Sequence, residues 1–375
     1  MKVIAFYLPQ YHRIPENDEW WGEGFTEWTN LKKAKPLFEG HNQPRIPLDN
    51  HYYNLLDPKE LDWQAKLAKK YGIYGFCIYH YWFNGHMLLQ KPVELLLKTK
   101  SIDTHYCICW ANESWTNAWV SSSDKFLIKQ SQGDRAEWVR HFNYLLPYFK
   151  DPRYIKIDGK PFFVIYRPEL FSNMSDMIDL WNQMAIDNGF KGMKFAYQVI
   201  ETHLKSEDSF DYRIEYEPVY ANYDLNHNKH KLLKSIKHVL VKIARPFNIN
   251  LEYVHPEGLV KRNYDQTWEA IIKRKPADKK ALPGAFVDWD NTPRKQNRGS
   301  VMVGYDVNKF EYYLEKQILH AKRDYHKNCI FIFAWNEWTE GGYLEPDESD
   351  GYKRLESVYK ALQNTGELEE NNHRE

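Results

Sequence analysis

Short runs of apolar residues alternate with segments of helical periodicity along most of the chain. The apolar runs predict buried strands over residues 3–8, 73–79, 106–110, 161–166, 193–199, 212–216, 284–287 and 330–334. Apolar positions three and four residues apart predict helices over residues 57–72, 92–98, 135–149, 175–188, 264–273, 307–325 and 352–362. Strands that alternate with helices favour a parallel sheet, so the pattern predicts a single α/β domain, a (β/α)₈ barrel of the TIM type with long βα loops.

The connection after the first strand has no periodicity. Residues 14–57 contain four prolines and several tryptophans. Loops of this length are usually functional or disordered, and the tryptophans argue against disorder. We expect the stretch from Trp20 to Trp28 to pack over the mouth of the barrel, close to the eighth strand.

A second irregular stretch lies between the sixth and seventh predicted strands. Residues 221–280 are predicted to be an insertion that contains a basic helix over 230–244. The barrel is then expected to span residues 1–363, and residues 364–375 to form a frayed, charged tail.

The most informative chemistry follows the eighth strand, where the sequence reads Trp-Asn-Glu-Trp-Thr-Glu-Gly-Gly from Trp335. Glu337 and Glu340 would point to opposite faces of a continuing strand, but the two glycines after them let the backbone turn. Both carboxylates are thus expected to face one cavity. Two carboxylates beside tryptophans suit glycoside chemistry, because one acid protonates a leaving oxygen and indole faces stack on sugar rings. A pair of solvated loop acids is the alternative interpretation.

Polar and aromatic residues also collect after the other predicted strands, and in a barrel these positions share the carboxyl-terminal rim. The candidate sugar-binding residues are Tyr11, Trp28, His80, Tyr81, Trp110, Asn112, Glu113, Arg167, Glu217, Asp288, Trp289, Trp335, Asn336 and Trp338. Glu113 could instead form a structural ion pair, and His80 could be a satisfied histidine at the barrel mouth.

Asp288-Trp289-Asp290 matches the Asp-x-Asp pattern with which many glycosyltransferases hold a divalent cation. The pattern is short and common by chance. Since it follows a barrel strand and the chain has no glycine-rich dinucleotide turn, a sugar-contacting loop or a pairing with Arg294 is favoured. No metal or cofactor is therefore predicted.

Composition narrows the class of partner. Lys plus Arg and Asp plus Glu number 51 each, which gives no electrostatic reason to bind nucleic acid or an anionic membrane. Aromatic residues make up 16% of the chain, with 14 Trp and 27 Tyr, which favours a ligand with flat apolar faces such as an oligosaccharide or polysaccharide.

Cysteine usage and the N-terminus suggest a compartment. The four cysteines lie in apolar runs without metal-ligand spacing, and they are predicted to be buried reduced thiols. No run reaches the length of a membrane span and no signal-peptide pattern precedes the first strand, so a cytoplasmic location is expected.

Three motifs carry a resemblance to a known family. NEWTEGGYLEPD near the C-terminus, FYLPQYH at the N-terminus and EWWGEGFTEW after it resemble the WbsX-like family of polysaccharide-locus proteins, from the first strand to Asp347. That family is related to glycoside hydrolase family 99, the endo-α-mannosidases and endo-α-mannanases, through the Glu-Trp-Xaa-Glu spacing.

The resemblance implies a retaining mechanism that passes through a 1,2-anhydro sugar. Glu337 would polarise or deprotonate a sugar 2-hydroxyl, and Glu340 would protonate the leaving oxygen. The spacing alone supports only two carboxylates at one site. Thr339 and the Gly-Gly-Tyr-Leu-Glu-Pro-Asp tail leave the sugar and its linkage open.

Two other functions stay open. The first is a glycosyltransferase of O-antigen or surface-polysaccharide synthesis, which is how WbsX-like proteins are commonly labelled and which an intracellular location would suit. The second is a sugar-binding barrel without catalysis, for which the tryptophans alone speak.

Overall fold

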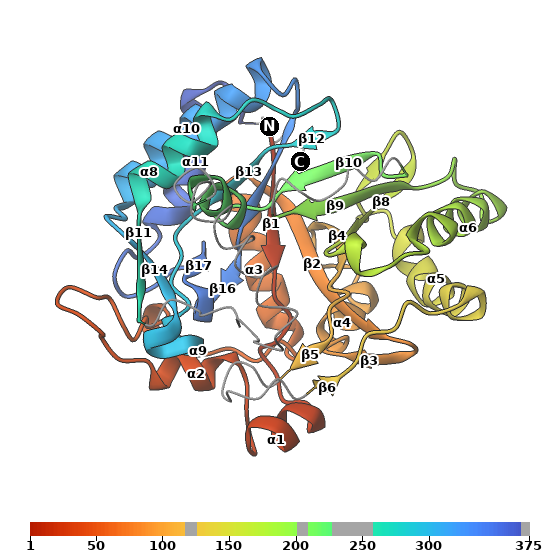
Figure 1. Ribbon diagram of the computed structural model, residues 1–375, viewed down its shortest axis with the longest axis horizontal. Coiled ribbons are helices and arrows are strands. Elements are labelled where there is room, and N and C mark those ends of the chain that lie inside the picture. Colours follow the sequence, from red (N-terminus) through yellow and green to blue (C-terminus); the bar gives the residue numbers. More distant parts are fainter. Residues whose placement is uncertain (117–125, 201–208, 227–257, 369–375) are drawn as a thin grey trace, which may run out of the picture.

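The computed structural model describes residues 1–116, 126–200, 209–226 and 258–368. Nine parallel strands of this part of the chain form a nearly closed barrel, and a TIM-type (β/α)₈ architecture is confirmed. In chain order they are β1 (Lys2–Tyr7), β2 (Ile73–Phe83), β4 (His105–Trp110), β8 (Lys160–Ile165), β9 (Lys194–Val199), β10 (Tyr212–Glu215), β12 (Ala281–Leu282), β13 (Gly284–Phe286) and β15 (Cys329–Phe333). Figure 1 shows β1 at the centre of the molecule, between β2 and the strands near the C-terminus.

The gap in the nearly closed barrel lies at Pro283, which separates β12 from β13. β12 pairs with β10, while β13 pairs with β15, so one stretch of chain joins both edges of the sheet. Proline has no N–H to donate to a ladder, which explains the break. Gly284 is required next to it, because a Cβ there would lie 1.8 Å from the carbonyl oxygen of Glu215.

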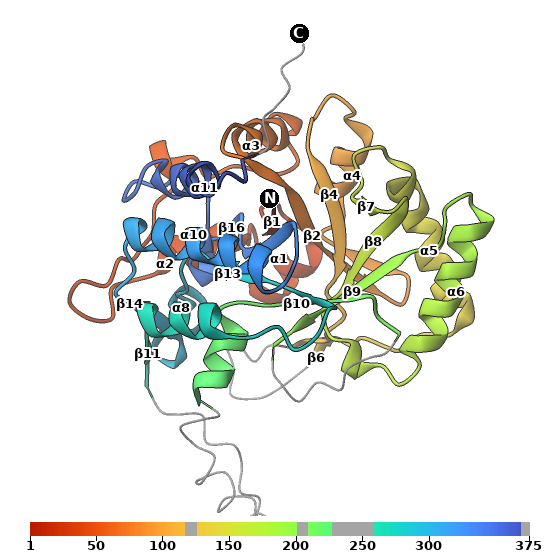
Figure 2. The same cartoon turned by 90° about the horizontal axis from the view of Figure 1, so that it is seen from above.

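Helices surround the strands, as the view from above shows (Figure 2). They are α3 (Pro58–Lys70), α4 (Lys91–Lys98), α5 (Arg135–Lys150), α6 (Met174–Asp187), α8 (Tyr264–Lys273), α10 (Val307–Arg323) and α11 (Lys353–Asn364). Asp57 begins α3 by accepting a hydrogen bond from the backbone N–H of Lys59 at 2.9 Å. These helices lie where the periodicity predicts them, whereas the basic helix predicted over 230–244 falls outside the described residues.

The segment after β1 differs from the prediction of an aperiodic loop. It contains α1 (Pro15–Trp21) and α2 (Glu27–Lys33), each about two turns long. Helices this short hardly show periodicity, and their signals are instead Pro15 in the first turn of α1 and the Thr26–Thr29 capping box of α2.

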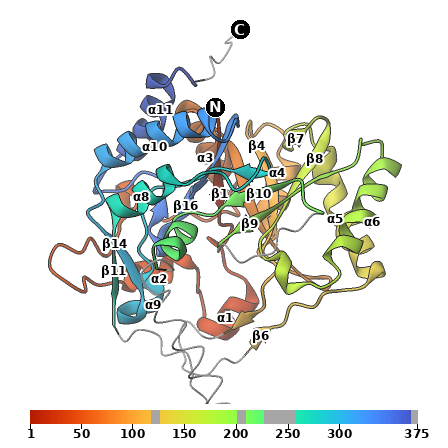
Figure 3. The same ribbon diagram turned by 45° about the horizontal axis from the view of Figure 1, so that its top comes forward.

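Smaller elements decorate the barrel. They are β3 (His86–Leu88), β5 (Trp115–Thr116), β6 (Phe126–Ile128), β7 (Lys156–Ile157), β11 (Val260–Asn263), β14 (Ser300–Val303), β16 (Asn336–Glu337), β17 (Gly342–Tyr343), the helix α9 (Thr292–Lys295), and the 3₁₀ turns η1 (Leu48–Asn50), η2 (Pro168–Leu170), η4 (Gln296–Arg298) and η5 (Trp338–Glu340). The helices α1, α2 and α9 and the strand β6 gather at the end toward which β1 and β2 point (Figures 1 and 3). This carboxyl-terminal end is where barrel enzymes place their active sites.

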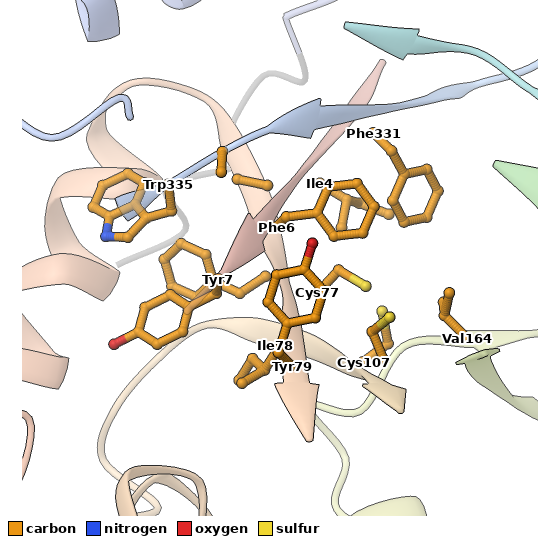
Figure 4. Close-up of a cluster of buried hydrophobic side chains, with 14 of the residues drawn as sticks. Ile4, Phe6, Tyr7, Cys77, Ile78, Tyr79, Cys107, Val164, Phe331 and Trp335 are labelled. Atoms are coloured by element: carbon orange, nitrogen blue, oxygen red, sulfur yellow. The ribbon is translucent and has the colours of Figure 1, made fainter. Parts of the chain in front are cut away.

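The interior is filled by side chains from neighbouring strands (Figure 4). The Phe6 ring stacks on that of Tyr79 with 5.8 Å between the centroids, and the centroid of Phe331 lies 5.9 Å from that of Phe6. All four cysteines are free thiols; Cys329 is partly exposed and the other three are buried. The barrel is therefore a packed core, and open space occurs at its rim.

Candidate active site

A cavity of about 580 Å³ opens at the carboxyl-terminal end of the barrel. Its described lining includes the tyrosines Tyr79, Tyr81, Tyr166 and Tyr216, the aromatic residues Trp21, Phe25 and Trp115, the acids Glu27, Glu113, Glu337 and Glu340, and Arg294. These residues come from the ends of several strands and from α1, α2 and α9, so the cavity is assembled from segments far apart in the sequence.

Glu337 and Glu340 reach this one cavity because the chain turns sharply after them. Glu337 ends β16, Glu340 ends the 3₁₀ turn η5, and Gly341 follows with a positive φ of 72°. A Cβ on Gly341 would lie 2.6 Å from the backbone nitrogen of Asp290, and one on Gly342 would lie 2.2 Å from the Phe333 ring. Both glycines are thus required for the close packing that aims the two carboxylates into the cavity.

Arg294 connects the two glutamates. Its Nη1 donates to Glu340 Oε1 at 2.7 Å, and its Nη2 lies 3.6 Å from Glu337 Oε2. Its Nη2 and Nε also donate to Glu27 Oε2, at 2.9 and 3.3 Å. One buried guanidinium therefore faces three carboxylates, whose negative charge raises its pKa against the opposing effect of burial.

The burial of Glu337 perturbs the pKa of its carboxyl group. Its side chain is 7% exposed, and Oε2 has no hydrogen-bond partner among the described residues. Burial raises the pKa of Glu337 well above its usual value, and the negative charge of Glu340 adds to this effect, while Arg294 opposes it. A perturbed carboxyl in a cavity is a candidate for acid–base chemistry.

The peptide next to these glutamates is held by Asn336. Its Oδ1 accepts from the backbone N–H of Leu8 at 2.8 Å, and its Nδ2 donates to the Leu8 carbonyl at 3.0 Å. The Tyr11 hydroxyl donates to the carbonyl of Asn336. Asn336 and Tyr11 thus join the first strand to the eighth, and both side chains are buried behind the cavity.

A further acid in this region was not among the sequence candidates. Glu345 accepts from the indole N–H of Trp338 at 2.7 Å, from the Tyr53 hydroxyl at 2.9 Å and from Gln64 Nε2 at 2.7 Å. Burial raises its pKa to about 7, although these hydrogen bonds oppose the shift. Glu345 thus fixes Trp338, which begins the turn η5 that carries Glu340, and it does not line the large cavity.

Glu113 lines the cavity and also forms the ion pair that was its alternative interpretation. Arg167 Nη1 donates to Glu113 Oε1 at 2.9 Å, and Arg167 also contacts Glu169. Asn112 orients this arginine by exchanging two hydrogen bonds with its backbone, at 2.7 and 2.8 Å. Burial raises the pKa of Glu113, and Arg167 opposes the rise.

Several aromatic candidates are packed within the protein. Trp28 donates its indole N–H to the Tyr53 carbonyl at 2.8 Å and packs on Trp338. Trp110 donates to the Trp82 carbonyl at 3.2 Å, and Trp335 packs on Phe76. Trp338 stacks on Tyr343 at 3.7 Å, and Trp289 is half-buried and donates to Ser300 Oγ at 2.9 Å. This placement favours structural roles for these tryptophans, while Trp21, Trp115 and Phe25 line the cavity.

The histidine candidate also lies away from the cavity. His80 is buried with its Nε2 3.0 Å from His141 Nε2, and the His141 ring stacks on Trp82. Burial lowers the pKa of His80 to about 3. Tyr81, the next residue, does line the cavity. The buried contact between His80 and His141 fits the alternative interpretation, in which the hydrogen bonding of His80 is satisfied within the protein near the barrel mouth.

The last two rim candidates are held by buried arginines. Glu217 pairs with Arg274, which also binds Glu215 at 3.0 Å. Asp288 accepts from Arg45 Nη2 at 2.7 Å.

The second acid of the Asp-x-Asp pattern is also held by protein groups. Asp290 Oδ2 lies 2.8 Å from His41 Nε2 and 2.6 Å from Gln43 Nε2. The sequence favoured Arg294 as a partner of this loop, but the structure instead pairs Arg294 with Glu27 and Glu340. Within the described residues, no group of three or more His, Cys, Asp and Glu side chains is placed to hold a metal ion.

The sequence predicts that no segment of the chain spans a membrane. In the part of the chain that the structure covers, none of the helices is both long and apolar enough to cross a bilayer.

Comparison with known proteins gives two kinds of relative. The WxcX proteins of two strains of Xanthomonas campestris pv. campestris are each 33% identical, over 365 and 372 residues and 96% of this chain. The chain spans about half of their length, 49% in each case.

The second kind of relative consists of solved structures with the same fold. The family 99 endo-α-mannosidase from Bacteroides thetaiotaomicron superimposes with a TM-score of 0.56 at 14% identity, covering 98% of each chain. A glycoside hydrolase-like protein gives 0.55 at 12% identity, covering 96% of this chain and 93% of the other. The model of the family described as "Glycosyltransferase WbsX" matches residues 3–358, and the chain therefore belongs to the WbsX family.

Proposed function

We propose that the large cavity is the active site of an enzyme that acts on a glycosidic bond of a bacterial oligosaccharide or polysaccharide, with Glu337 and Glu340 as the catalytic pair. The observation that carries this proposal is that both carboxylates line one cavity and face the same guanidinium, that of Arg294. Two carboxyl groups at one site are the common requirement of glycoside hydrolysis.

The lining suits a sugar. Four tyrosines offer hydroxyl groups to a polyhydroxylated ligand, and the rings of Trp21, Phe25 and Trp115 offer apolar faces on which pyranose rings stack. The volume of about 580 Å³ lies in the range of pockets for ligands larger than one sugar ring. An oligosaccharide segment is therefore the proposed ligand, without a cofactor.

The charge of the lining favours hydrolysis over transfer from a nucleotide sugar. Among the described lining residues, Glu27, Glu113, Glu337 and Glu340 are acids, and Arg294 is the cationic residue. A nucleoside diphosphate would bring further negative charge into this field.

The proposed chemistry follows the mechanism that the resemblance to family 99 implies. Glu337 takes the proton of the sugar 2-hydroxyl while O2 attacks C1, and the C1–O bond to the leaving group breaks as Glu340 gives that oxygen its proton. Water then adds to C1 of the 1,2-anhydro sugar and loses its proton to Glu340, while Glu337 returns its proton to O2. Both carboxyl groups end as they began, and the configuration at C1 is retained.

The second candidate is a glycosyltransferase of surface-polysaccharide synthesis, which the name of the family supports. It would use Asp288 and Asp290 around a divalent cation, yet both carboxylates already bind protein groups. Calorimetry separates the candidates, since binding of a nucleotide sugar that depends on Mn²⁺ would favour transfer and metal-free binding of an oligosaccharide would favour hydrolysis. A binding barrel without catalysis would bind the oligosaccharide and leave it intact.

The test of the catalytic pair uses the leaving group. A panel of bacterial glycans and aryl glycosides is first screened for turnover by the wild-type chain. We expect Glu340→Gln to lose about 10²- to 10⁴-fold on natural glycosides and to retain much of its activity on an aryl glycoside with an acidic phenol, which departs without a proton. Glu337→Gln should lose both activities, because the 2-hydroxyl must be activated whatever leaves.

The control is Glu356→Gln, which removes a carboxylate from α11 outside the cavity. Wild-type rates in both cavity variants would show that Glu337 and Glu340 are not the catalytic pair. Equal losses of aryl-glycoside turnover would contradict the division of roles.

A further inference from the structure

The position of one guanidinium nitrogen distinguishes the carboxylates around Arg294. Nη2 donates to Glu27 Oε2 at 2.9 Å and lies 3.6 Å from Glu337 Oε2, beyond hydrogen-bond distance. The Glu337 oxygen that faces it is buried and has no hydrogen-bond partner within the described residues. Glu27 and Glu337 thus compete for the same nitrogen, and Glu27 holds it.

Glu27 is itself fixed in place. It lies in the first turn of α2, which packs against η5, the turn that carries Glu340. Its side chain is 4% exposed and accepts from both Nη2 and Nε of Arg294, and also from the Thr339 hydroxyl. A buried carboxylate with three donors has little freedom to move, so the arginine is held on its side of the cavity.

We propose that Glu27 is a positioning residue that holds Arg294 on itself and on Glu340, so that Glu337 carries a proton in the ligand-free protein. The geometry is the basis: Glu340 receives a hydrogen bond from the guanidinium at 2.7 Å, and Glu337 receives none from it. The raised pKa of Glu337, caused first by burial and then by the charge of Glu340, agrees with a protonated Glu337.

The other groups that face Glu337 do not change charge near neutral pH. Tyr11, Tyr79, Tyr81 and Tyr216 come from the β1–α1 connection, from β2 and from the end of β10, and burial raises the pKa of each of them well above its usual value. The protonation of Glu337 is therefore set by Glu27, Glu340 and Arg294.

The inference has a consequence for catalysis that rests on the proposed function. If Glu337 is to take a proton from a sugar 2-hydroxyl, it must first be ionised. The 0.7 Å difference between the two contacts of Nη2 is small, so a ligand that draws Nη2 from Glu27 to Glu337 would place an opposite charge on the base at the time it is needed. Ionisation of Glu337 on binding would then couple substrate entry to catalysis.

The experiment measures protonation and needs no substrate. Infrared spectra of the ligand-free protein are recorded against pH, since a protonated carboxyl and a carboxylate absorb separately. Subtracting the spectra of Glu337→Gln isolates the carboxyl band of Glu337 and the pH midpoint at which it appears. We expect the wild-type midpoint to lie above that of an ordinary glutamate.

Two variants should move this midpoint in opposite directions. In Glu27→Gln, Nη2 loses its carboxylate and can close on Glu337, so the midpoint should fall by about one to three pH units. In Arg294→Gln the opposing positive charge is gone, so the midpoint should rise. Each is measured as a difference against the corresponding double variant with Glu337→Gln, and Glu356→Gln serves as the control for loss of a distant carboxylate.

Opposite shifts would not follow from a merely structural role, because general loosening of the site would move both midpoints toward that of a solvated glutamate. The proposal is wrong if Glu27→Gln leaves the midpoint unchanged or raises it. If Glu27→Gln does not fold, Arg294→Gln decides alone, and an unchanged or lowered midpoint overturns the proposal. A protein that shows these shifts but cleaves no glycan would refute the proposed function and leave this inference standing.

Discussion

Asp288→Asn should destabilise the fold, because the carboxylate of Asp288 compensates a buried guanidinium. Arg45 is 6% exposed, its Nη2 donates to Asp288 Oδ2 at 2.7 Å, and its Nη1 donates to the Gly341 carbonyl at 3.1 Å. Removing one partner of a buried ion pair usually costs about 3–5 kcal/mol, because the other charge is left uncompensated. Asp290 lies 3.9 Å from the same nitrogen and retains part of the compensation. We therefore expect a loss near the lower end, about 3 kcal/mol.

The assay is urea unfolding at neutral pH, with and without Mn²⁺ and a nucleotide sugar such as UDP-glucose. The wild-type free energy of unfolding should not change on this addition. A metal–nucleotide site would instead raise it by about 2.7 kcal/mol at a hundredfold excess over the dissociation constant. Asp62→Asn is the matched control, since Asp62 forms a partly exposed pair with Lys66 on α3 and should cost less than about 1 kcal/mol.

The opposite pattern would refute the reasoning. If Asp288→Asn costs no more than Asp62→Asn, and if it abolishes a Mn²⁺-dependent stabilisation of the wild type, then Asp288 is a metal ligand and the transferase candidate is favoured. The experiment thus tests the structural assignment of the Asp-x-Asp pattern and the class of enzyme together.

Two further predictions concern aromatic and histidine side chains. Trp21→Ala should weaken binding of a cavity ligand by about 1–3 kcal/mol in calorimetry, with little loss of stability. Trp28→Ala should instead lower the free energy of unfolding by about 3–5 kcal/mol, because Trp28 is buried. Weaker ligand binding without loss of stability in Trp28→Ala would place Trp28 at the sugar. Burial lowers the pKa of His80 to about 3 and also lowers that of His141, so the unfolded chain binds more protons below its histidine pKa of about 6.5. The contribution of these histidines to the free energy of unfolding should be complete above that pH and fall by about 1.4 kcal/mol per pH unit and per histidine below it. His141→Phe, which keeps the stacking on Trp82, should reduce this slope in acid unfolding curves. An unchanged slope would contradict the assignment of His141 as a buried neutral histidine.

Most barrel strands could be predicted because they are apolar runs between turn signals. β10 contains Arg213 and Glu215, and β12 has only two residues and was not predicted as a strand. A buried parallel strand needs no polar face, so its sequence identifies it without knowledge of its neighbours. The two helices after β1 could not be predicted in this way. They are too short for periodicity, and they are stabilised by contacts such as those of Trp28 with Tyr11 and Tyr53.

Glu337 and Glu340 could be proposed as a pair from the sequence because both glutamates and the glycines that turn the chain lie in one stretch. Glu27 and Arg294 could not, because they are 267 residues apart and only the folded barrel joins them. The tryptophans show the complementary limit. Their number predicts aromatic surfaces, but the sequence does not tell whether a tryptophan lines the cavity, as Trp21 does, or packs on other protein rings, as Trp28 does.

The long sequence separation of these contacts also determines at which stage of folding the site can form. β1 pairs with β15, and Asn336 binds the backbone of Leu8, so the segment that carries Glu337 and Glu340 is held by residues more than 300 positions away. Contacts of such long separation are costly in chain entropy and form only when most of the barrel is in place. A fragment that retains the eighth strand but lacks β1 through α2 would keep both glutamates and lose Glu27 and the hydrogen bonds between Asn336 and the Leu8 backbone. Glu337 would then be solvated and would titrate as an ordinary glutamate, because its perturbation arises from burial within the complete barrel and not from the local sequence.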